Sequence, residues 1–188
     1  MLDKVLLAKY ILASKSPRRK YLLEQIGLKF IAVDSNAEEV MDKNAHRSVK
    51  INSQRKSRAV SSKYKGRIVI GADTVVYLNG KILNKPEDLK EAKRYLKMLS
   101  GKSHTVYTGV NVINNNSGKE IYGFEKTIVE FRKLSSEEIN YYVDKFKPLD
   151  KAGAYAIQKW IGVTGIKKID GDFYNVMGLP VSRVVQLI

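Results

Sequence analysis

The sequence predicts an α/β domain built on a mixed, twisted sheet flanked by helices. Short apolar runs with strand character alternate with stretches in which apolar residues recur at helical spacing, which is typical of α/β proteins. An Asn-Gly pair between two apolar runs predicts a tight β-hairpin, so some strands should be antiparallel. The 188 residues contain no repeat, linker or low-complexity tract. We therefore expect one domain over residues 1–188.

The first half of the chain contains one clear helix signal. Ser16 is a good N-cap, Pro17 suits the first helical position and Gly27 suits the stop, so a helix is predicted over Pro17–Ile26. The same patterns predict a strand at Lys9–Ala13, a strand at Leu28–Val33, a helix at His46–Tyr64, a strand at Arg67–Ala72, and a hairpin of Val75–Leu78 with Lys81–Leu83.

The second half carries a capping box, in which Ser135 and Glu138 satisfy each other's backbone at the start of a helix that should end near Phe146. Pro86 is expected to open another helix. The predicted elements are a helix at Glu87–Leu99, strands at Val106–Ile113 and Ile121–Phe131 joined by a polar turn, strand and loop after Phe146, and a short terminal helix that Pro180 starts.

The chain is strongly basic, with 34 Lys and Arg residues against 19 Asp and Glu residues and a formal net charge of +15. This charge favours an anionic partner such as a nucleic acid, a nucleotide or a membrane surface, although a lysine-rich proteome would also produce it. The basicity is uneven, because Met41–Lys65 contains eight basic residues and one acidic residue. A nucleic-acid-binding protein that uses this face is one open hypothesis.

Several classes of protein are disfavoured by composition. The longest uncharged apolar runs are too short to span a bilayer, so we expect no membrane partner. The chain has no cysteine, which excludes disulfides, thiolate metal sites and a cysteine nucleophile. One lysine precedes the brief apolar N-terminal patch and Lys9 interrupts it, which makes this stretch a poor signal peptide. We therefore expect a cytoplasmic protein.

Two arginines stand where a helix dipole disfavours positive charge. Arg18 and Arg19 follow Pro17 on the first turn of the predicted helix, at a cost of roughly 0.3–1 kcal/mol each. They lie either on a solvated helix start or beside an anion that uses the same free amides.

Carboxylates and lysines elsewhere could join them. Asp73 follows small residues at the end of an apolar strand, where ligands of α/β sheets tend to bind, although a turn or cap would explain it too. Lys56 shares a helical stripe with apolar residues and either snorkels to water or points into a cleft. Lys85 precedes a helix, where an exposed charge is ordinary. Glu39 could hold Mg²⁺ with Asp73, or lie in a solvated loop.

These side chains together suggest phosphoryl chemistry on a nucleotide. Cations neutralise phosphate oxygens and the leaving group, and a carboxylate orients or deprotonates water. The sequence contains no P-loop motif and its two histidines lack metal-ligand spacing.

Several motifs in order resemble one family. The stretches "LASKSPRR", "GADTVV", "NKPED", "LSGKSH", "DKAGAYAIQ" and "KKIDGDFYNVMGLP" are similar to those of the Maf family of nucleoside triphosphate pyrophosphatases, also described as septum-formation inhibitors. The resemblance runs from about Ile11 to the C-terminus. It implies an elongated domain like that of inosine triphosphate pyrophosphatase, with a mixed sheet and two lobes around a central cleft.

The resemblance also implies roles for residues at matching positions. Asp73 matches the proton acceptor for water that attacks the α-phosphate, and Glu39 matches an acidic residue near a Mg²⁺ or Mn²⁺ ion that Asp73 would also bind. The positions that match residues at the phosphates are Ser14, Ser16, Arg19, Lys56 and Lys85. The reaction implied is nucleoside triphosphate plus water giving the monophosphate and pyrophosphate.

Base preference is implied by three further positions. Arg18, Thr74 and Gln158 resemble the branch acting on dTTP and UTP, and often CTP, whereas a branch that prefers 7-methyl-GTP usually has Trp in place of the first arginine. A glutamine amide can both donate to and accept from a pyrimidine edge. The departures from the family pattern are Lys15, in place of a small residue, and Lys159 and Trp160, which we expect beside the base pocket.

The resemblance leaves the biological use open between cleansing of the nucleotide pool and arrest of cell division. Family members are often homodimers. A nucleotide sensor that binds but turns over slowly is a third hypothesis beside the enzyme and the nucleic-acid-binding protein.

Overall fold

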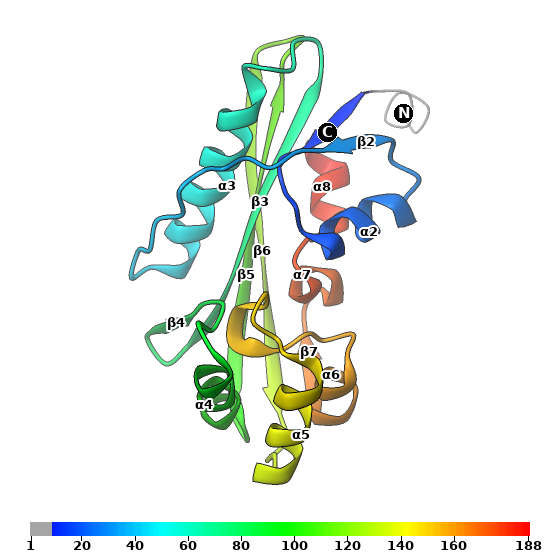
Figure 1. The fold of residues 1–188 in the computed structure, drawn as a ribbon. Coiled ribbons are helices and arrows are strands. Elements are labelled where there is room, and N and C mark those ends of the chain that lie inside the picture. The colour runs from blue at the N-terminus through cyan, green and yellow to red at the C-terminus, as the bar shows by residue number, and fades with distance from the viewer. Residues whose placement is uncertain (1–8) are drawn as a thin grey trace.

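A seven-stranded mixed sheet forms the centre of the computed structural model, which describes residues 9–188 (Figure 1). Residues 1–8, which carry most of the stretch considered as a signal peptide, lie outside the described residues. The strand order is β2-β1-β3-β5-β6-β7, and β4 pairs with β3. The strands are β1 (Tyr10–Leu12), β2 (Phe30–Ala32), β3 (Ile68–Leu78), β4 (Lys81–Leu83), β5 (Ser103–Asn114), β6 (Lys119–Phe131) and β7 (Ile166–Asp170).

The sheet is mixed, as the sequence predicts. Strand β1 runs parallel to β2 and β3, and every other pair is antiparallel. The β3–β4 hairpin turns at Asn79 and Gly80, whose φ angles of 46° and 83° match the expected tight turn.

The sequence predicted two separate strands, Arg67–Ala72 and Val75–Leu78, but the structure has one continuous strand, β3. It continues through Asp73 and Thr74 because both pair in register with Gly109 and Thr108 of β5. On the other edge of β3, β1 pairs only up to Ile70 and β4 pairs only from Val76. Asp73 therefore lies in mid-strand, on a stretch of edge that neither β1 nor β4 covers.

The two N-terminal helices lie on opposite sides of the sheet (Figure 1). Helix α2 (Pro17–Gln25) begins as predicted, with the Ser16 Oγ accepting from the backbone N–H of Arg19. Helix α3 (Ala45–Ser61) packs on β3 and β5. The approach is close because a Cβ on Gly71 would lie 2.4 Å from the Ser53 carbonyl oxygen.

The remaining helices differ in part from expectation. Helix α4 (Leu89–Leu99) is capped by Asp88, so Pro86 precedes it rather than opening it. Helix α5 (Ser136–Phe146) has the predicted capping box. The region expected as strand and loop contains the 3₁₀ turn η1 (Ala152–Ala154), α6 (Trp160–Gly165) and α7 (Phe173–Met177) before α8 (Val181–Leu187). Helices this short depend on tertiary packing, so they leave little periodicity in the sequence.

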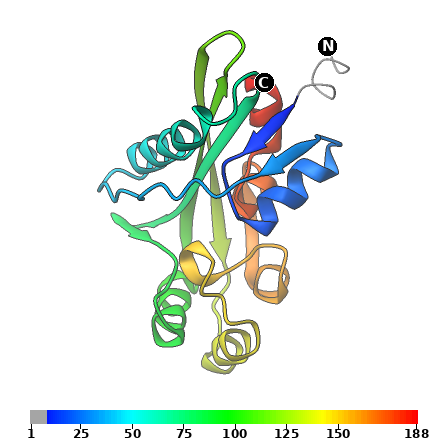
Figure 2. The ribbon, with the colours of Figure 1, turned by 45° about the horizontal axis from the view of Figure 1, so that its top comes forward.

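Helices gather toward the two ends of the three long strands (Figures 1 and 2). Helices α2, α3 and α8 surround the half that contains β1 and β2, here called the upper lobe. Helices α4, α5 and α6 surround the other half, the lower lobe. This arrangement agrees with the two-lobed, elongated shape that the resemblance implies. None of the helices within residues 9–188 has the length and apolar character needed to cross a bilayer.

Candidate active site

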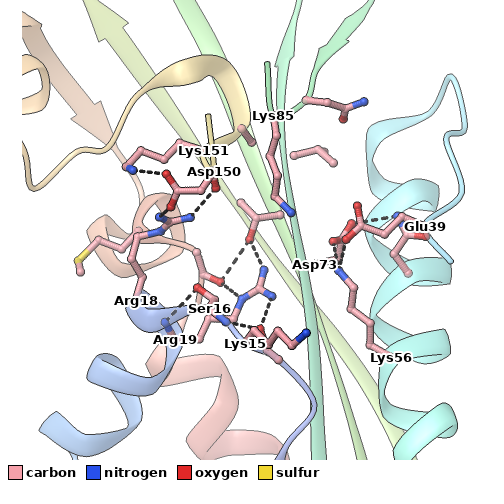
Figure 3. Close-up of a pocket in the computed structure, with 18 of the residues that line it drawn as sticks. Lys15, Ser16, Arg18, Arg19, Glu39, Lys56, Asp73, Lys85, Asp150 and Lys151 are labelled. Carbon is pink, nitrogen blue, oxygen red and sulfur yellow. Dashed lines mark hydrogen bonds and ion pairs between the residues drawn. The ribbon is translucent and has the colours of Figure 1, made fainter. Parts of the chain in front are cut away.

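A cleft of about 630 Å³ lies between the lobes and brings together every residue predicted for the site. Its lining comes from the β1–α2 loop, the β2–α3 loop, helix α3, the open edge of β3, and the segments around residues 150–158 and 176–178. The predicted residues on it are Ser14, Ser16, Arg18, Arg19, Glu39, Lys56, Asp73, Thr74, Lys85 and Gln158. In Figure 3, Arg18 and Arg19 lie on the left of the view, Glu39, Lys56 and Asp73 lie together on the right, and Lys85 lies between the two groups.

The Lys56 ammonium lies between two carboxylates. Its Nζ is 2.6 Å from Oδ1 of Asp73 and 2.7 Å from Oε1 of Glu39. The Lys56 side chain is only 11% exposed, so it points into the cleft instead of snorkelling to water. Burial favours the neutral form of Glu39, but the cations Lys56, Lys85 and Arg19 outweigh it and hold the pKa of Glu39 below its usual value.

Asp73 is buried and accepts hydrogen bonds at both carboxylate oxygens. Asn52 on α3 donates its Nδ2 to Oδ2 of Asp73 at 3.0 Å, opposite the Lys56 contact. Asp73 is 5% exposed, and a buried polar group is costly unless it is hydrogen-bonded, so these two donors stabilise it inside the protein. The mid-strand position of Asp73 and the approach of α3 together create this environment.

Arg19 spans three separate segments with one guanidinium. Its Nε donates to the Gly178 carbonyl at 2.8 Å, and its terminal nitrogens donate to the hydroxyls of Ser14 at 3.2 Å and Thr74 at 3.1 Å. Burial lowers the pKa of Arg19, and the nearby Asp73 carboxylate opposes this effect. The planar fork is thereby held rigidly, with Thr74 also bonded to Gly178 and within 3.0 Å of the Thr108 hydroxyl.

Arg18 crosses the cleft to the lower lobe. It donates to a carboxylate oxygen of Asp150 at 2.8 Å and to the Asp150 carbonyl at 3.3 Å, and Lys151 pairs with the same carboxylate. Gln158 follows in the same segment. Its Oε1 is buried without a hydrogen-bond partner among the described residues, which leaves an acceptor free for a ligand.

Three lysines and a tryptophan occupy different places around the cleft. Lys85 points into it (Figure 3), and Lys15 lines it and pairs with Asp34. Lys159 and Trp160, expected beside the base pocket, are not among the lining residues. Trp160 instead packs edge-on against Tyr141, with ring centroids 5.1 Å apart.

A divalent cation would find two carboxylates here. Within residues 9–188, no three His, Cys, Asp or Glu side chains converge in a way that could hold a metal. Glu39 and Asp73 supply hard oxygen donors across the Lys56 ammonium. Mg²⁺ usually takes one or two protein carboxylates and completes its shell with water and substrate phosphates, so this donor pair fits such an ion.

Sequence reasoning missed several polar residues with direct contacts to predicted site residues, among them Asn52, Thr108 and Asp150. Asn52 lies one helical turn before Lys56, so the i, i+4 spacing could have identified it as facing the same cleft. Asp150 begins the "DKAGAYAIQ" motif, but nothing local in the sequence indicates that it pairs with Arg18.

Comparison with known proteins gives a family match over almost the whole chain and similar proteins that share one name. Residues 9–188 match the family model described as "Maf-like protein". A protein of Thermoanaerobacter pseudethanolicus named dTTP/UTP pyrophosphatase is 46% identical, covering 96% of this chain and 95% of the relative. One of Thermosipho melanesiensis with the same name is 47% identical, covering 95% of each. A solved structure, that of the Staphylococcus aureus Ham1 protein, is 15% identical with a TM-score of 0.47, covering 65% of this chain and 71% of that one.

Proposed function

The chain belongs to the Maf-like family, and from this premise we propose that it is a pyrophosphatase of pyrimidine nucleoside triphosphates. In this reaction one water and one nucleoside triphosphate give the monophosphate and pyrophosphate. The substrates proposed are dTTP and UTP, with CTP and modified pyrimidine nucleotides as further candidates. The name shared by the relatives, dTTP/UTP pyrophosphatase, supports this choice.

The observation that carries the proposal is the convergence of cations on two carboxylates in one cleft. Arg19, Lys56 and Lys85 come from three separate segments, and all three lie close enough to Glu39 to lower the pKa of its carboxyl. Asp73 and Arg18 line the same cleft. Phosphoryl transfer requires little covalent chemistry from the protein, and it depends on positioned positive charge around the phosphates. This cleft supplies that charge.

Asp73 is the proposed general base. Its ionised carboxylate would accept a proton from the water that attacks the α-phosphorus. The bond from the α-phosphorus to the bridging oxygen then breaks, and the electron pair leaves with pyrophosphate. Arg19, Lys56 and Lys85 stabilise the negative charge on the leaving group. The hydroxyls of Ser14 and Ser16 lie at the same end of the cleft as Arg19 and would contact the phosphates.

A divalent cation, Mg²⁺ or Mn²⁺, is part of this proposal, with Glu39 and Asp73 as its protein ligands. Such an ion supplies charge neutralisation at the phosphate oxygens when bound. With the ion bound, the carboxylates of Glu39 and Asp73 would face two cations, the metal ion and the Lys56 ammonium.

Base selection is proposed for Arg18, Thr74 and Gln158. The unpartnered Oε1 of Gln158 can accept the N3–H of thymine or uracil, and the Gln158 amide can also donate to a pyrimidine carbonyl. Arg18 reaches toward the same segment through Asp150. A cytoplasmic location, a homodimer and a role in pool cleansing or division arrest stay predictions.

The test measures product release from each nucleotide. Purified protein is mixed with every common NTP and dNTP and with 7-methyl-GTP, in Mg²⁺, in Mn²⁺ or with EDTA, and pyrophosphate and orthophosphate are quantified separately. We expect pyrophosphate from dTTP and UTP, none with EDTA, and none from Asp73→Asn. Isothermal titration should show that Asp73→Asn still binds the nucleotide.

Other outcomes point elsewhere. Pyrophosphate chiefly from 7-methyl-GTP would keep the reaction and overturn the roles of Arg18 and Gln158. Binding of dTTP without turnover in the wild type would indicate a nucleotide sensor. Salt-sensitive binding of nucleic acid with no hydrolysis would favour the basic face of Met41–Lys65.

A further inference from the structure

Asn52 hydrogen-bonds to the candidate general base and to the segment that carries Glu39. Its Nδ2 donates to Oδ2 of Asp73 at 3.0 Å and to the Val40 carbonyl at 3.1 Å. Its Oδ1 accepts from the Val40 backbone N–H at 2.8 Å. The side chain is 3% exposed, so both amide donors and the amide oxygen are satisfied inside the protein.

Helix α3 presents two donors to the Asp73 carboxylate, one to each oxygen. Lys56 bonds to Oδ1 and Asn52, one turn earlier on the same helix, bonds to Oδ2. The helix is held close to β3 at Gly71, so both donors have fixed positions. A carboxylate bonded at both oxygens cannot rotate about its terminal torsion, which is otherwise broad.

The same amide holds the β2–α3 loop onto the helix. Val40 follows Glu39 directly, and its backbone N–H and C=O both bond to Asn52. A second anchor lies further along the loop, where the hydroxyl of Ser48 bonds to both backbone groups of Asp42. Ser48 anchors the loop without touching Asp73. Asn52 bonds to both.

We propose that Asn52 is a positioning residue that couples the orientation of the Asp73 carboxylate to the docking of the Glu39 segment. An amide is required because the site needs two donors and one acceptor on one short side chain. Leucine has a similar volume and supplies none of them, and aspartate would place a second carboxylate against Asp73 without a donor. The inference rests on the proposed function.

The test separates catalytic positioning from loop anchoring. Variants Asn52→Leu, Asn52→Ser and Ser48→Ala are assayed with dTTP and Mg²⁺, and hydrogen–deuterium exchange is followed over residues 36–44. We expect Asn52→Leu to lower kcat by about tenfold to a hundredfold, because a small misplacement of a reacting group is costly. The KM for dTTP should change by less than about threefold, and exchange in the loop should accelerate.

The Ser48→Ala variant should also speed exchange in the loop, but with a much smaller loss of kcat. Asn115→Leu is the matched control, because its amide likewise donates to backbone carbonyls at the far end of α3, outside the cleft. It should leave kcat unchanged. Thermal unfolding checks each variant, and Asn52→Ser is read in the same way if Asn52→Leu does not fold.

The inference is overturned if Asn52→Leu and Asn52→Ser keep the wild-type kcat, or if Ser48→Ala loses as much kcat as they do. The second result would reduce Asn52 to a loop anchor. Failure of the proposed function is a distinct outcome, because the wild type itself would then release no pyrophosphate. In that case the exchange data still report whether Asn52 holds the loop.

Discussion

Arg18 and Asp150 form an ion pair 2.8 Å long that joins the upper lobe to the lower lobe across the mouth of the cleft. Arg18 projects from the first turn of α2, and Asp150 lies in the loop after α5. Burial would raise the pKa of Asp150, but hydrogen bonds from Lys151 and Arg18 outweigh it and lower that pKa. The position of Arg18 is therefore set by the opposite lobe.

Loss of the Asp150 charge should alter base preference. In Asp150→Asn the side chain keeps its shape and the ion pair weakens, which frees Arg18. We expect the KM ratio between dTTP and 7-methyl-GTP to change at least about threefold with kcat for dTTP little affected. The free energy of unfolding should fall by no more than about 1 kcal/mol, since Asp150 is 59% exposed. Glu130→Gln, which breaks an ion pair with Lys167 outside the cleft lining, is the control. An unchanged KM ratio would mean that the position of Arg18 does not influence base selection.

Removal of the Lys56 charge should impair both turnover and stability. In Lys56→Met the carboxylate of Asp73 keeps Asn52 but loses its ammonium partner, a cost of about 1–3 kcal/mol in the free energy of unfolding. The pKa of Glu39 should rise toward its usual value because Lys56 is the main cation that lowers it. We expect kcat with dTTP to fall about a hundredfold or more.

Lys56→Arg is the matched variant, because it keeps the charge and changes the geometry. It should retain more of the stability than of the activity. Urea unfolding and steady-state kinetics on both variants measure the two effects. If Lys56→Met and the wild type have the same kcat, Lys56 has no role in the reaction.

Close packing of α3 on β3 can be tested at Gly71. A Cβ there would lie 2.4 Å from the Ser53 carbonyl oxygen and 2.7 Å from the Ser57 amide nitrogen, so Gly71→Ala must push the helix away. Overpacking of this kind costs about 1–3 kcal/mol, and activity should also fall because Lys56 and Asn52 move with the helix. Chemical denaturation and kcat measure the two consequences.

Gly123→Ala is the control for this substitution. A Cβ on Gly123 of β6 would approach only the Arg183 and Leu187 side chains, at 3.0–3.3 Å, and these can shift. The substitution should cost less than about 1 kcal/mol. If Gly71→Ala and Gly123→Ala lower the free energy of unfolding by similar amounts, the close approach of α3 to β3 does not require a glycine at position 71.

Stability should depend on His104 at mildly acidic pH. His104 of β5 is buried, with its Nε2 2.8 Å from the Tyr155 hydroxyl, and burial lowers its pKa from 6.5 to about 4. Below pH 6.5 the His104 imidazole is therefore protonated in the unfolded chain, whereas in the folded protein it is protonated only below about pH 4. Stability is lost as pH falls through this window, by about 2 kcal/mol between pH 7.5 and 5.

In His104→Gln this loss should disappear, so the gap in unfolding free energy between wild type and variant should narrow at pH 5. Urea unfolding at both pH values measures it. Tyr155→Phe removes the hydrogen bond and keeps the burial, so it should retain the wild-type pH dependence. The prediction fails if the difference in unfolding free energy between wild type and His104→Gln is the same at pH 7.5 and at pH 5.

Local patterns were sufficient where a few neighbouring residues decide the structure. The start of α2 at Ser16 and Pro17 and the capping box of Ser135 and Glu138 were predicted and confirmed. Residue type and motif order also identified six of the charged side chains that line the cleft, Arg18, Arg19, Glu39, Lys56, Asp73 and Lys85, whereas Asp34, Asp150 and Lys151 were not predicted. These predictions depend on interactions within one helical turn or on chemical character alone.

Predictions were wrong where distant segments decide. Strand β3 passes through Asp73 because β5, about 35 residues later, pairs with it continuously from Ile68 to Tyr77. Helices α6 and α7 are too short to show periodicity and form because their surroundings bury them. The start of α4 at Asp88 shows a side-chain cap prevailing over the proline signal.

Local sequence thus specified which side chains of this chain carry charge and where most of its helices begin, since those properties reside in neighbouring residues. The partners of those charges required the folded chain. Arg18 meets Asp150 from 132 residues away, and Asn52 meets Asp73 from 21 residues away. Strand register and the close approach of α3 bring these groups together, and neither is encoded within a short stretch of sequence.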